Sequence, residues 1–406
     1  MNTNIFELST EQLREIANKL QEKIEEGLKK EGKEILAIPT HIYPGATIEN
    51  GKVMALDWGG SNFRASIVEF KNGKPTVLEQ KKKKLDAVVT VGFKPEDLHR
   101  EMAATISQLE ALDKTVTQIG YCFSYPAASR LNGDAVLLRW AKRIDIKEMI
   151  EQPVGELLLN YLNNYFKKDG IEFKNIKVIN DTVACLFAGL SETGYDSYIG
   201  LIVGTGTNMA GLMRLDKIEK LNNKETRLIP INLESGNFSP PHLTVIDALV
   251  DAISNNKGIQ RFEKAVSGGY LGEVFKTFFP YEKIRYDFDA EHLENLIFRR
   301  KGYEEAPEEQ VQVARWICNR SAQLVAASLA GLAQVIAAQE PKVKRICLAA
   351  DGSVFWGWGK NETGEPYYKA LVASELEKLL PAGVSVNIIP EMKDPNLIGS
   401  AIAALS

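Results

Sequence analysis

The chain contains 406 residues, of which 45% are hydrophobic and 25% are charged, and this composition is typical of a globular protein large enough for two domains. Its formal net charge of -4 argues against a surface that binds nucleic acid. The four cysteines and four histidines are scattered without the spacings of zinc sites, metalloproteases, serine hydrolases or disulfide frameworks, so we expect buried thiols in a reducing compartment.

The N-terminal segment 9–30, STEQLREIANKLQEKIEEGLKK, predicts a capped helix rather than a signal peptide. Ser9 supplies the N-cap, and Gln12 completes a capping box. Apolar residues recur at helical spacing at Leu13, Ile16, Leu20, Ile24 and Leu28. One face of this helix should therefore pack on the rest of the chain. Because the segment is not a signal peptide and the thiols should be reduced, we expect the protein to be cytoplasmic.

The stretch 56–64, LDWGGSNFR, places an acid, a glycine pair and a hydroxyl residue at the end of an apolar strand. Backbone amides can approach a phosphate closely where side chains are absent, so the stretch could form a phosphate loop. It could equally be a simple hairpin turn, and the stretch alone leaves both open. The lysine run 81–84 that follows is best explained as a solvated strand edge.

The segment 175–190, NIKVINDTVACLFAGL, predicts a strand over 176–179 and a helix over 182–190. Asn180 and Asp181 then lie at the carboxyl end of the strand, where open α/β sheets bind their ligands. Asp181 could instead only cap the helix.

A second strand–turn–strand unit, IGLIVGTGTNMAGLMRL over 199–215, repeats the plan of residues 54–70. Both turns contain glycine, a hydroxyl residue and asparagine in a row, at 60–62 and at 206–208. A third turn, CLAADGSVF over 347–355, also follows an apolar strand. Because neither the Rossmann nor the P-loop pattern is present, the repeat favours two similar halves that face one nucleotide.

Residues 321–339, SAQLVAASLAGLAQVIAAQ, form an uncharged apolar run that could be a membrane span or a buried helix. The run is rich in Ala, Ser and Gln, and Arg315 and Arg320 lie just upstream, so a core helix is the better prediction. Pro307 should open this helix and Pro341 should close it.

In chain order, these motifs resemble those of the hexokinase family, the eukaryotic-type sugar kinases of the actin-like ATPase superfamily. The segments that carry the resemblance are IPTHIYPG (38–45), ALDWGGSNFR (55–64), FSYPA (123–127), WAK (140–142), VINDTVACL (178–186), GLIVGTGTNMAG (200–211), INLESGNF (231–238), IQRFEKAVSGGYLGE (259–273) and AADGSVF (349–355). They span most of the chain in the family's order.

The resemblance implies an α/β fold, the two-domain actin-like ATPase (ribonuclease H-like) fold, with a sugar-binding cleft between the domains. The expected small domain takes residues 50–180 and 393–406, and the large domain takes residues 1–49 and 181–392. The implied activity is ATP-dependent phosphorylation of a hexose at its 6-hydroxyl, with glucose first and mannose or fructose also possible. The implied partners are a small-molecule hexose and ATP with Mg2+, without nucleic acid or membrane, and the oligomeric state stays open.

Phosphoryl transfer to a sugar requires a base near O6, positive charge for the phosphates, and exclusion of water. The resemblance assigns the catalytic roles to Asp181, as the base, and to Lys142. It assigns sugar hydrogen bonds to Ser124, Lys142, Asn180, Asn208, Glu234 and Glu263. It assigns nucleotide contacts to Asp57, Gly59, Gly60, Ser61, Asn62, Arg64, Gly204, Thr205, Gly206, Asp351, Gly352 and Ser353. Asp57 is also the expected Mg2+ partner, through water.

Three departures from the family pattern bear on substrate preference. Ala141 replaces the usual threonine of WTK, ESGNF stands where the family has EWGAF, and KDPNLIGSAIAA over 393–404 replaces a Gly/Ser-rich turn. These changes bear on sugar preference and nucleotide affinity, and they leave the base and the phosphate loops intact. Two alternatives remain: a kinase for another sugar or amino sugar, and a non-catalytic sugar-sensing protein on the same fold. The second predicts loss of the base or of a phosphate loop, but Asp57, Asp181 and both glycine turns are present.

Overall fold

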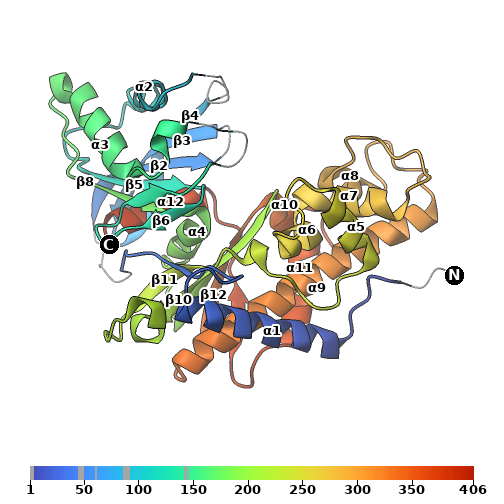
Figure 1. Cartoon of the computed structure of the whole chain (residues 1–406). Coiled ribbons are helices and arrows are strands. Elements are labelled where there is room, and N and C mark those ends of the chain that lie inside the picture. Colours follow the sequence, from blue (N-terminus) through green and yellow to red (C-terminus); the bar gives the residue numbers. More distant parts are fainter. Residues whose placement is uncertain (1–3, 44–49, 60–61, 86–91, 141–143, 145) are drawn as a thin grey trace. The chain divides into compact units, whose positions relative to one another are not determined.

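The computed structural model describes residues 4–43, 50–59, 62–85, 92–140, 144 and 146–406 (Figure 1). Backbone contacts divide the chain into two units. Unit 1 comprises Met1–Ala37, Tyr195–Thr226 and Leu233–Glu391, and unit 2 comprises Ile38–Gly194, Arg227–Asn232 and Met392–Ser406. Residues 181–194, which the sequence division placed in the large domain, group with unit 2 because helix α4 (Asp181–Gly189) packs on helix α12 (Pro395–Ala404).

Unit 2 is built on a five-stranded sheet with the order β4-β3-β2-β5-β8. The antiparallel strands are β2 (Asn50–Gly59), β3 (Asn62–Lys71) and β4 (Lys74–Lys84), while β5 (Gln118–Phe123) and β8 (Asn175–Ile179) run parallel to β2. The predicted strand over 176–179 is confirmed. The lysine run lies on the edge strand β4, as predicted.

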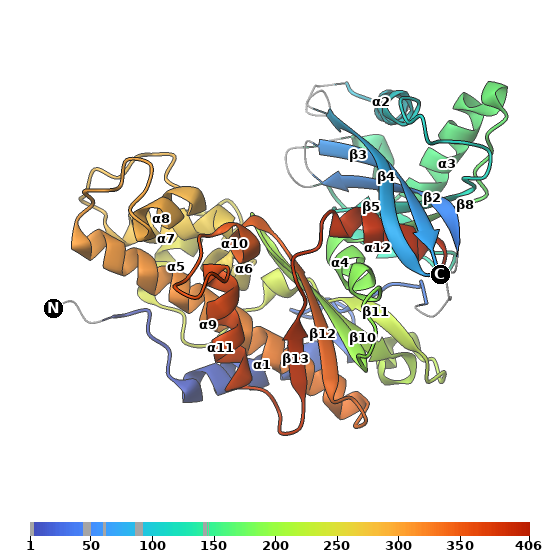
Figure 2. The same ribbon diagram turned by 180° about the vertical axis from the view of Figure 1, so that it is seen from behind.

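The side chains of the unit 2 sheet alternate between two faces, as the period of two in a strand requires. Met54, Leu56 and Trp58 point into a core with helices α2 (Pro95–Ile106) and α3 (Val154–Tyr165). Helix α12 packs on β5, β2 and β8 (Figure 2). A Cβ at Gly120 would lie 1.8 Å from the carbonyl oxygen of Ser400, so the close approach of α12 requires glycine there.

Smaller elements complete unit 2. Strands β6 (Ala127–Ser129) and β7 (Ala135–Leu137) form a hairpin, and β1 (Ile38–Pro39) pairs with β11 (Leu228–Asn232). Two short 3-10 turns, η2 (Lys147–Met149) and η3 (Lys167–Asp169), lie before and after α3.

Unit 1 contributes four neighbouring strands in the order β10-β9-β12-β13. Strand β9 (Ser197–Val203) pairs antiparallel with β10 (Thr207–Arg214) and parallel with β12 (Arg345–Asp351), which in turn pairs parallel with β13 (Ser385–Ile388). Both strand–turn–strand units predicted from the sequence are therefore present, as β2–β3 and as β9–β10.

The helices of unit 1 gather around α9 (Glu308–Gln339), which packs against α1 (Thr10–Lys29) and α11 (Tyr367–Glu377) (Figure 1). The predicted capping box of α1 is confirmed, with Ser9 as N-cap and Gln12 as its partner. Helix α9 is long and apolar enough to cross a membrane by composition, but 78% of its most apolar window is buried inside the protein. The predicted core helix between Pro307 and Pro341 is confirmed.

The remaining elements of unit 1 follow β10. They are the 3-10 turns η4 (Leu215–Lys217), η5 (Glu219–Leu221) and η6 (Ser235–Asn237), and the helices α5 (Val245–Ile253), α6 (Arg261–Val266), α7 (Gly268–Phe278), α8 (Ala290–Ile297) and α10 (Ser353–Gly357).

Candidate active site

In unit 2, the carboxyl ends of three parallel strands bring candidate residues to one edge of the sheet. Asp57 near the end of β2 is the register partner of Cys122 in β5, and Cys122 is the partner of Ile179 at the end of β8. Ser124 directly follows β5, and its backbone N–H donates to the carbonyl oxygen of Trp58 at 3.2 Å. Asp57, Ser124 and Asp181 therefore follow neighbouring strands at the edge where open α/β sheets bind ligands.

Gly59, the last residue of β2, lies against Ser124. A Cβ at Gly59 would lie 3.2 Å from the Ser124 hydroxyl oxygen, so a side chain there would crowd it. Glycine thus lets the end of β2 lie close to Ser124, a predicted sugar contact. Gly60 and Ser61 of this loop lie outside the described residues, as do Ala141 and Lys142.

Asp57 and Arg64 are register partners on β2 and β3, and their side chains form an ion pair. Arg64 Nε donates to Asp57 Oδ2 at 2.8 Å, and Arg64 Nη1 donates to Asp394 Oδ1 at 2.8 Å. Asp394 belongs to the unusual C-terminal segment and precedes α12. The guanidinium therefore ties strands β2 and β3 to the start of the last helix.

The other carboxylate oxygen of Asp57, Oδ1, is buried and has no hydrogen-bond partner among the described residues. A buried carboxylate oxygen without a partner is costly unless a cation or water satisfies it. This oxygen fits a hydrated magnesium ion, which binds carboxylates while it keeps several waters. In the described part of the chain, no group of three or more His, Cys, Asp or Glu side chains could hold a metal ion, so protein ligands here would be few and water would complete the shell.

Asp181 is the first residue of α4, and Asn180 is the N-cap. The side chain of Asn180 accepts the Thr182 N–H at 2.9 Å, which is the bond that defines a cap. Asp181 Oδ1 also lies 2.8 Å from the same N–H. Because Asn180 already caps the helix, the capping explanation for Asp181 loses its main support.

Cys122 lies near Asp57 and Asp181 at this edge of the sheet. Burial raises the pKa of its thiol well above the usual value, and the negative charges of Asp57 and Asp181 raise it further. A neutral thiol here adds no charge beside the two carboxylates. All four cysteines are buried free thiols, as predicted.

In unit 1, the second candidate phosphate loop is held by the first residues of α7. The Gly268 N–H donates to the Gly204 carbonyl at 2.7 Å, and the Gly269 N–H donates to the Thr205 carbonyl at 3.0 Å. A Cβ at Gly269 would lie only 2.7 Å from the Thr205 oxygen. The glycine pair of α7 is therefore needed for this contact, a role that was not predicted from the sequence.

The third predicted turn, 351–353, meets the same loop. Gly352 has φ of 118°, and a Cβ there would lie 2.2 Å from the Val203 carbonyl oxygen. A Cβ at Gly204 would contact the Cα of Gly352 at 3.4 Å. The two predicted turns of unit 1 and the start of α7, which are far apart in the sequence, thus converge on one place.

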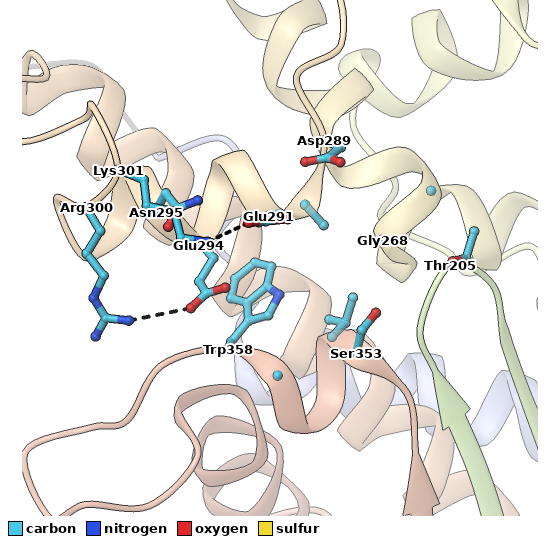
Figure 3. A pocket seen from close by; sticks show the side chains of 14 residues that line it. Thr205, Gly268, Asp289, Glu291, Glu294, Asn295, Arg300, Lys301, Ser353 and Trp358 are labelled. Carbon is cyan, nitrogen blue, oxygen red and sulfur yellow. Dashed lines mark hydrogen bonds and ion pairs between the residues drawn. The ribbon is translucent and has the colours of Figure 1, made fainter.

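A cavity of about 680 Å³ opens at this place (Figure 3), within the size range of small-molecule sites. Its walls come from the second loop, α7, α8, α10 and the segment after α8. The lining residues are Thr205, Gly268, Gly269, Asp289, Ala290, Glu291, Glu294, Asn295, Arg300, Lys301, Ser353, Val354, Gly357 and Trp358. Thr205 and Ser353 were predicted; the others were missed. A glycine pair that opens a helix, as in SGGY, is the signal that could have identified Gly268 and Gly269.

Ion pairs line one wall of the cavity. Lys301 lies 2.7 Å from Glu291, and Arg300 lies 3.8 Å from Glu294 (Figure 3). Burial raises the pKa of Glu294, whose carboxylate also accepts the Gly359 N–H at 3.1 Å. The wall therefore carries both signs of charge, and its acids are partly neutralised by Arg300 and Lys301.

The sugar-contact candidates of unit 1 lie close to Gly206. Glu263 Oε2 accepts the Thr207 N–H at 3.0 Å, and a Cβ at Gly206 would lie 2.7 Å from this oxygen. Asn208 Oδ1 accepts the Ser235 N–H at 3.1 Å, directly after Glu234, which has the left-handed φ of 54°. The structure therefore brings Asn208, Glu234 and Glu263 together at the start of β10.

Comparison with known proteins identifies the family. Two hexokinase family models match residues 2–190 and residues 198–281 and 286–406. The chain belongs to the hexokinase family. It is 32% identical over 287 residues to Hexokinase-2 of Schizosaccharomyces pombe, covering 67% of this chain and 62% of that protein. It is 31% identical over 317 residues to a glucokinase of Aspergillus niger, covering 69% of this chain and 61% of that protein. The chain thus spans less than two thirds of the length of these relatives.

Solved structures show the same fold. A hexokinase from Schistosoma mansoni, in complex with glucose, matches with a TM-score of 0.81 at 24% identity, over 99% of this chain and 96% of that one. A glucokinase from Streptomyces griseus, in complex with glucose and AMPPNP, matches with a TM-score of 0.53 at 18% identity, over 87% of this chain and 99% of that one. The expected two-domain α/β sugar-kinase fold is confirmed.

Proposed function

We propose that this protein is an ATP-dependent hexokinase that phosphorylates the 6-hydroxyl of a hexose, with glucose as the expected substrate and mannose or fructose as further ones. The observation that supports this most directly is the edge of the unit 2 sheet, where Asp57, Ser124 and Asp181 follow three neighbouring strands. The relatives named hexokinase and glucokinase, and the solved neighbours that hold glucose, point to the same substrate class.

Asp181 is proposed as the residue that orients the sugar 6-hydroxyl and accepts its proton. A carboxylate is a weak base, but it suffices because the proton can transfer late in phosphoryl transfer. Asn180 carries the helix cap, so the charge of Asp181 is not required for α4 to begin. We also propose Lys142 as its catalytic partner, as the family resemblance implies.

Asp57 is proposed to hold Mg2+ through water, using its buried Oδ1. The ion would neutralise charge on the phosphates of ATP. Arg64 already binds the other oxygen of Asp57, so it fixes the orientation of the carboxylate and adds positive charge at the first loop.

We propose that the nucleotide uses the cavity of unit 1. Its phosphates would meet the backbone amides of the loop 204–206, beside the N-terminus of α7, where the helix dipole favours an anion. The residues 351–353 would border the adenosine. In unit 2, Gly59 to Asn62 would supply further phosphate contacts.

The proposed sugar contacts are hydrogen-bond acceptors and donors suited to a polyol. Unit 2 would supply Ser124 and Asn180, and unit 1 would supply Asn208, Glu234 and Glu263. The division into small and large domains remains a proposal, and it differs from the two units at residues 38–43, 181–194 and 227–232. We also propose a cytoplasmic location.

A coupled assay of ADP release tests the proposal across glucose, mannose, fructose and glucosamine. We expect sugar-dependent ADP release, with glucose giving the highest kcat/KM. ADP release with glucosamine alone would instead support a kinase for an amino sugar. Sugar binding by calorimetry without ADP release from any sugar would support the non-catalytic sensor.

A further inference from the structure

The segment 254–260, which joins helices α5 and α6 of unit 1 (Figure 1), leads directly to Glu263, one of the proposed sugar contacts. Both carboxylate oxygens of Glu263 are held by the protein. Oε2 accepts the Thr207 N–H at 3.0 Å, and Oε1 accepts a hydrogen bond from Gln260 Nε2 at 3.1 Å. These two bonds fix the orientation of the carboxylate, and its remaining lone pairs can still accept sugar hydroxyls.

The side-chain amide of Gln260 must present its nitrogen to Glu263, because its oxygen would repel the negative carboxylate. The amide oxygen, Oε1, then faces the other way and accepts a hydrogen bond from Asn256 Nδ2 at 2.6 Å. Gln260 has the left-handed φ of 55°, which a residue other than glycine adopts at a cost. Its side chain makes no cap bond to the backbone of α6, so its contacts form a chain from Asn256 to Glu263.

A buried ion pair anchors the backbone around Asn256. Lys264 Nζ donates to Asp251 Oδ1 at 2.7 Å and to the carbonyl oxygen of Asn256 at 2.9 Å. Asp251 also accepts the Gly258 N–H, at 3.0 Å to each carboxylate oxygen. The side chain of Lys264 is 3% exposed and that of Asp251 is 9% exposed, so loss of either would leave a buried charge unpaired. The pair therefore fixes the segment on both sides of the Asn256 side chain.

We propose that Asn256 is a positioning residue for sugar binding: its amide N–H sets the direction of the Gln260 amide, and Gln260 in turn holds the Glu263 carboxylate for the sugar hydroxyls. This inference rests on the proposed sugar-binding role of Glu263. An ionised aspartate at this position has the same shape but can only accept a hydrogen bond, so it would turn the Gln260 amide round. The amide oxygen of Gln260 would then face the Glu263 carboxylate and push it out of position.

The variant Asn256→Asp tests this role, and Asn255→Asp is the matched control. Asn255 is the exposed neighbour of Asn256, so the control adds the same charge to the same segment. At about pH 8, where a new carboxyl group is ionised, Asn256→Asp should raise the KM for glucose roughly tenfold above that of the control. The KM for ATP should change little. Steady-state kinetics measure both constants, and thermal melting shows whether the two variants are equally folded.

The pH dependence of the same two variants separates positioning from a structural role. When the new carboxyl group is protonated, its O–H can donate to Gln260 Oε1 as the asparagine does. The KM for glucose of Asn256→Asp should therefore approach that of Asn255→Asp as the pH is lowered. The charged groups around the site, Asp251, Lys264 and Glu263, are the same in both variants, so the ratio of the two KM values reports the new carboxyl group.

The variant Gln260→Gly tests whether Asn256 acts through Gln260. Glycine adopts the left-handed φ of 55° without a side-chain clash, so the melting temperature should stay the same or rise. The KM for glucose should rise, because Glu263 loses its partner. Adding Asn256→Asp to Gln260→Gly should then have no further effect, since the two residues act on sugar binding in series.

Three results would overturn the role of Asn256 while leaving the proposed function in place. They are equal KM values for glucose in Asn256→Asp and Asn255→Asp at every pH, additive effects in the double variant, and an equal rise of both KM values together with a lower melting temperature. A wild type that neither binds nor phosphorylates any sugar would overturn the proposed function itself, and this role with it.

Discussion

The two strand–turn–strand units share a local plan but use different chemistry around the turn. In unit 2, β2–β3 places Asp57 opposite Arg64, and Arg64 reaches Asp394. In unit 1, the turn of β9–β10 is held by backbone bonds from Gly268 and Gly269. The same pattern of glycine, hydroxyl residue and asparagine is therefore supported by side-chain charge in one unit and by close backbone approach in the other. One local pattern can therefore be stabilised by different interactions, because the surroundings of a turn decide what holds it.

We expect the largest loss of turnover from a change at Asp181, which follows strand β8 at the ligand-binding edge proposed for the unit 2 sheet. Asp181→Asn keeps the shape of the side chain and can still hydrogen-bond a sugar hydroxyl, but it cannot accept the proton. We expect turnover to fall by about 10²–10⁴ with only a modest loss of glucose affinity. Steady-state kinetics and calorimetry on one folded sample measure both.

The control for Asp181→Asn is Asp216→Asn, which removes a carboxylate paired with Arg214 on the surface of unit 1 and should not affect turnover. Near-normal turnover of Asp181→Asn would falsify the catalytic role of this residue. Lost sugar binding with a normal melting curve would instead show that its charge mainly holds the sugar.

Arg64→Ala tests the role of side-chain charge at the first candidate phosphate loop. Removing the guanidinium frees Asp57 and removes positive charge from the first loop, so the KM for ATP should rise roughly 10- to 100-fold. The KM for glucose should change much less. Equal changes in both constants would sink the assignment of Arg64 to the nucleotide side.

Gly269→Ala tests the close backbone approach that holds the second candidate phosphate loop. The new Cβ would lie 2.7 Å from the Thr205 carbonyl oxygen, so the second loop must shift. We expect a loss of about 1–3 kcal/mol in stability and a higher KM for ATP. Gly357→Ala is the control in the same cavity, because its Cβ would meet nothing closer than 3.9 Å. Similar behaviour of the two variants would contradict the need for close approach at Gly269.

The two units should also respond differently to acid. Burial lowers the pKa of His99, in the core of unit 2, from 6.5 to about 4. The unfolded chain therefore binds a proton that the folded chain excludes between these values, and stability falls as the pH drops. Between pH 7 and 5.5 this amounts to about 1 kcal/mol.

Thermal melting across this pH range measures the effect, and His99→Gln should flatten the pH dependence. In unit 1, burial alone would raise the pKa of Asp247, but Arg320 holds it below 3.8, so that ion pair persists until more acidic pH. A His99→Gln variant with the wild-type pH dependence would show that another group causes the loss.

Much of the site could be predicted because its signals are local. The strand ahead of Asp181, the glycine turns at 204–206 and 351–353, and the α1 cap at Ser9 each depend on a few neighbouring residues. Propensity, capping and backbone freedom act over short distances, so the chain reveals them directly. The division into units was harder, because residues 181–194 follow the packing of α4 on α12 rather than any boundary signal.

Local sequence signals are sufficient to predict the elements, the turns and the residue types available for chemistry. The tertiary structure decided which of them meet: Arg64 with Asp394, Gly268 with Gly204, and the acids of α5 with Arg320 and Lys264. These pairs join segments from 13 to 330 residues apart. Such contacts depend on which strands are neighbours and which helix faces are covered, and these are properties of the packed core rather than of any short stretch.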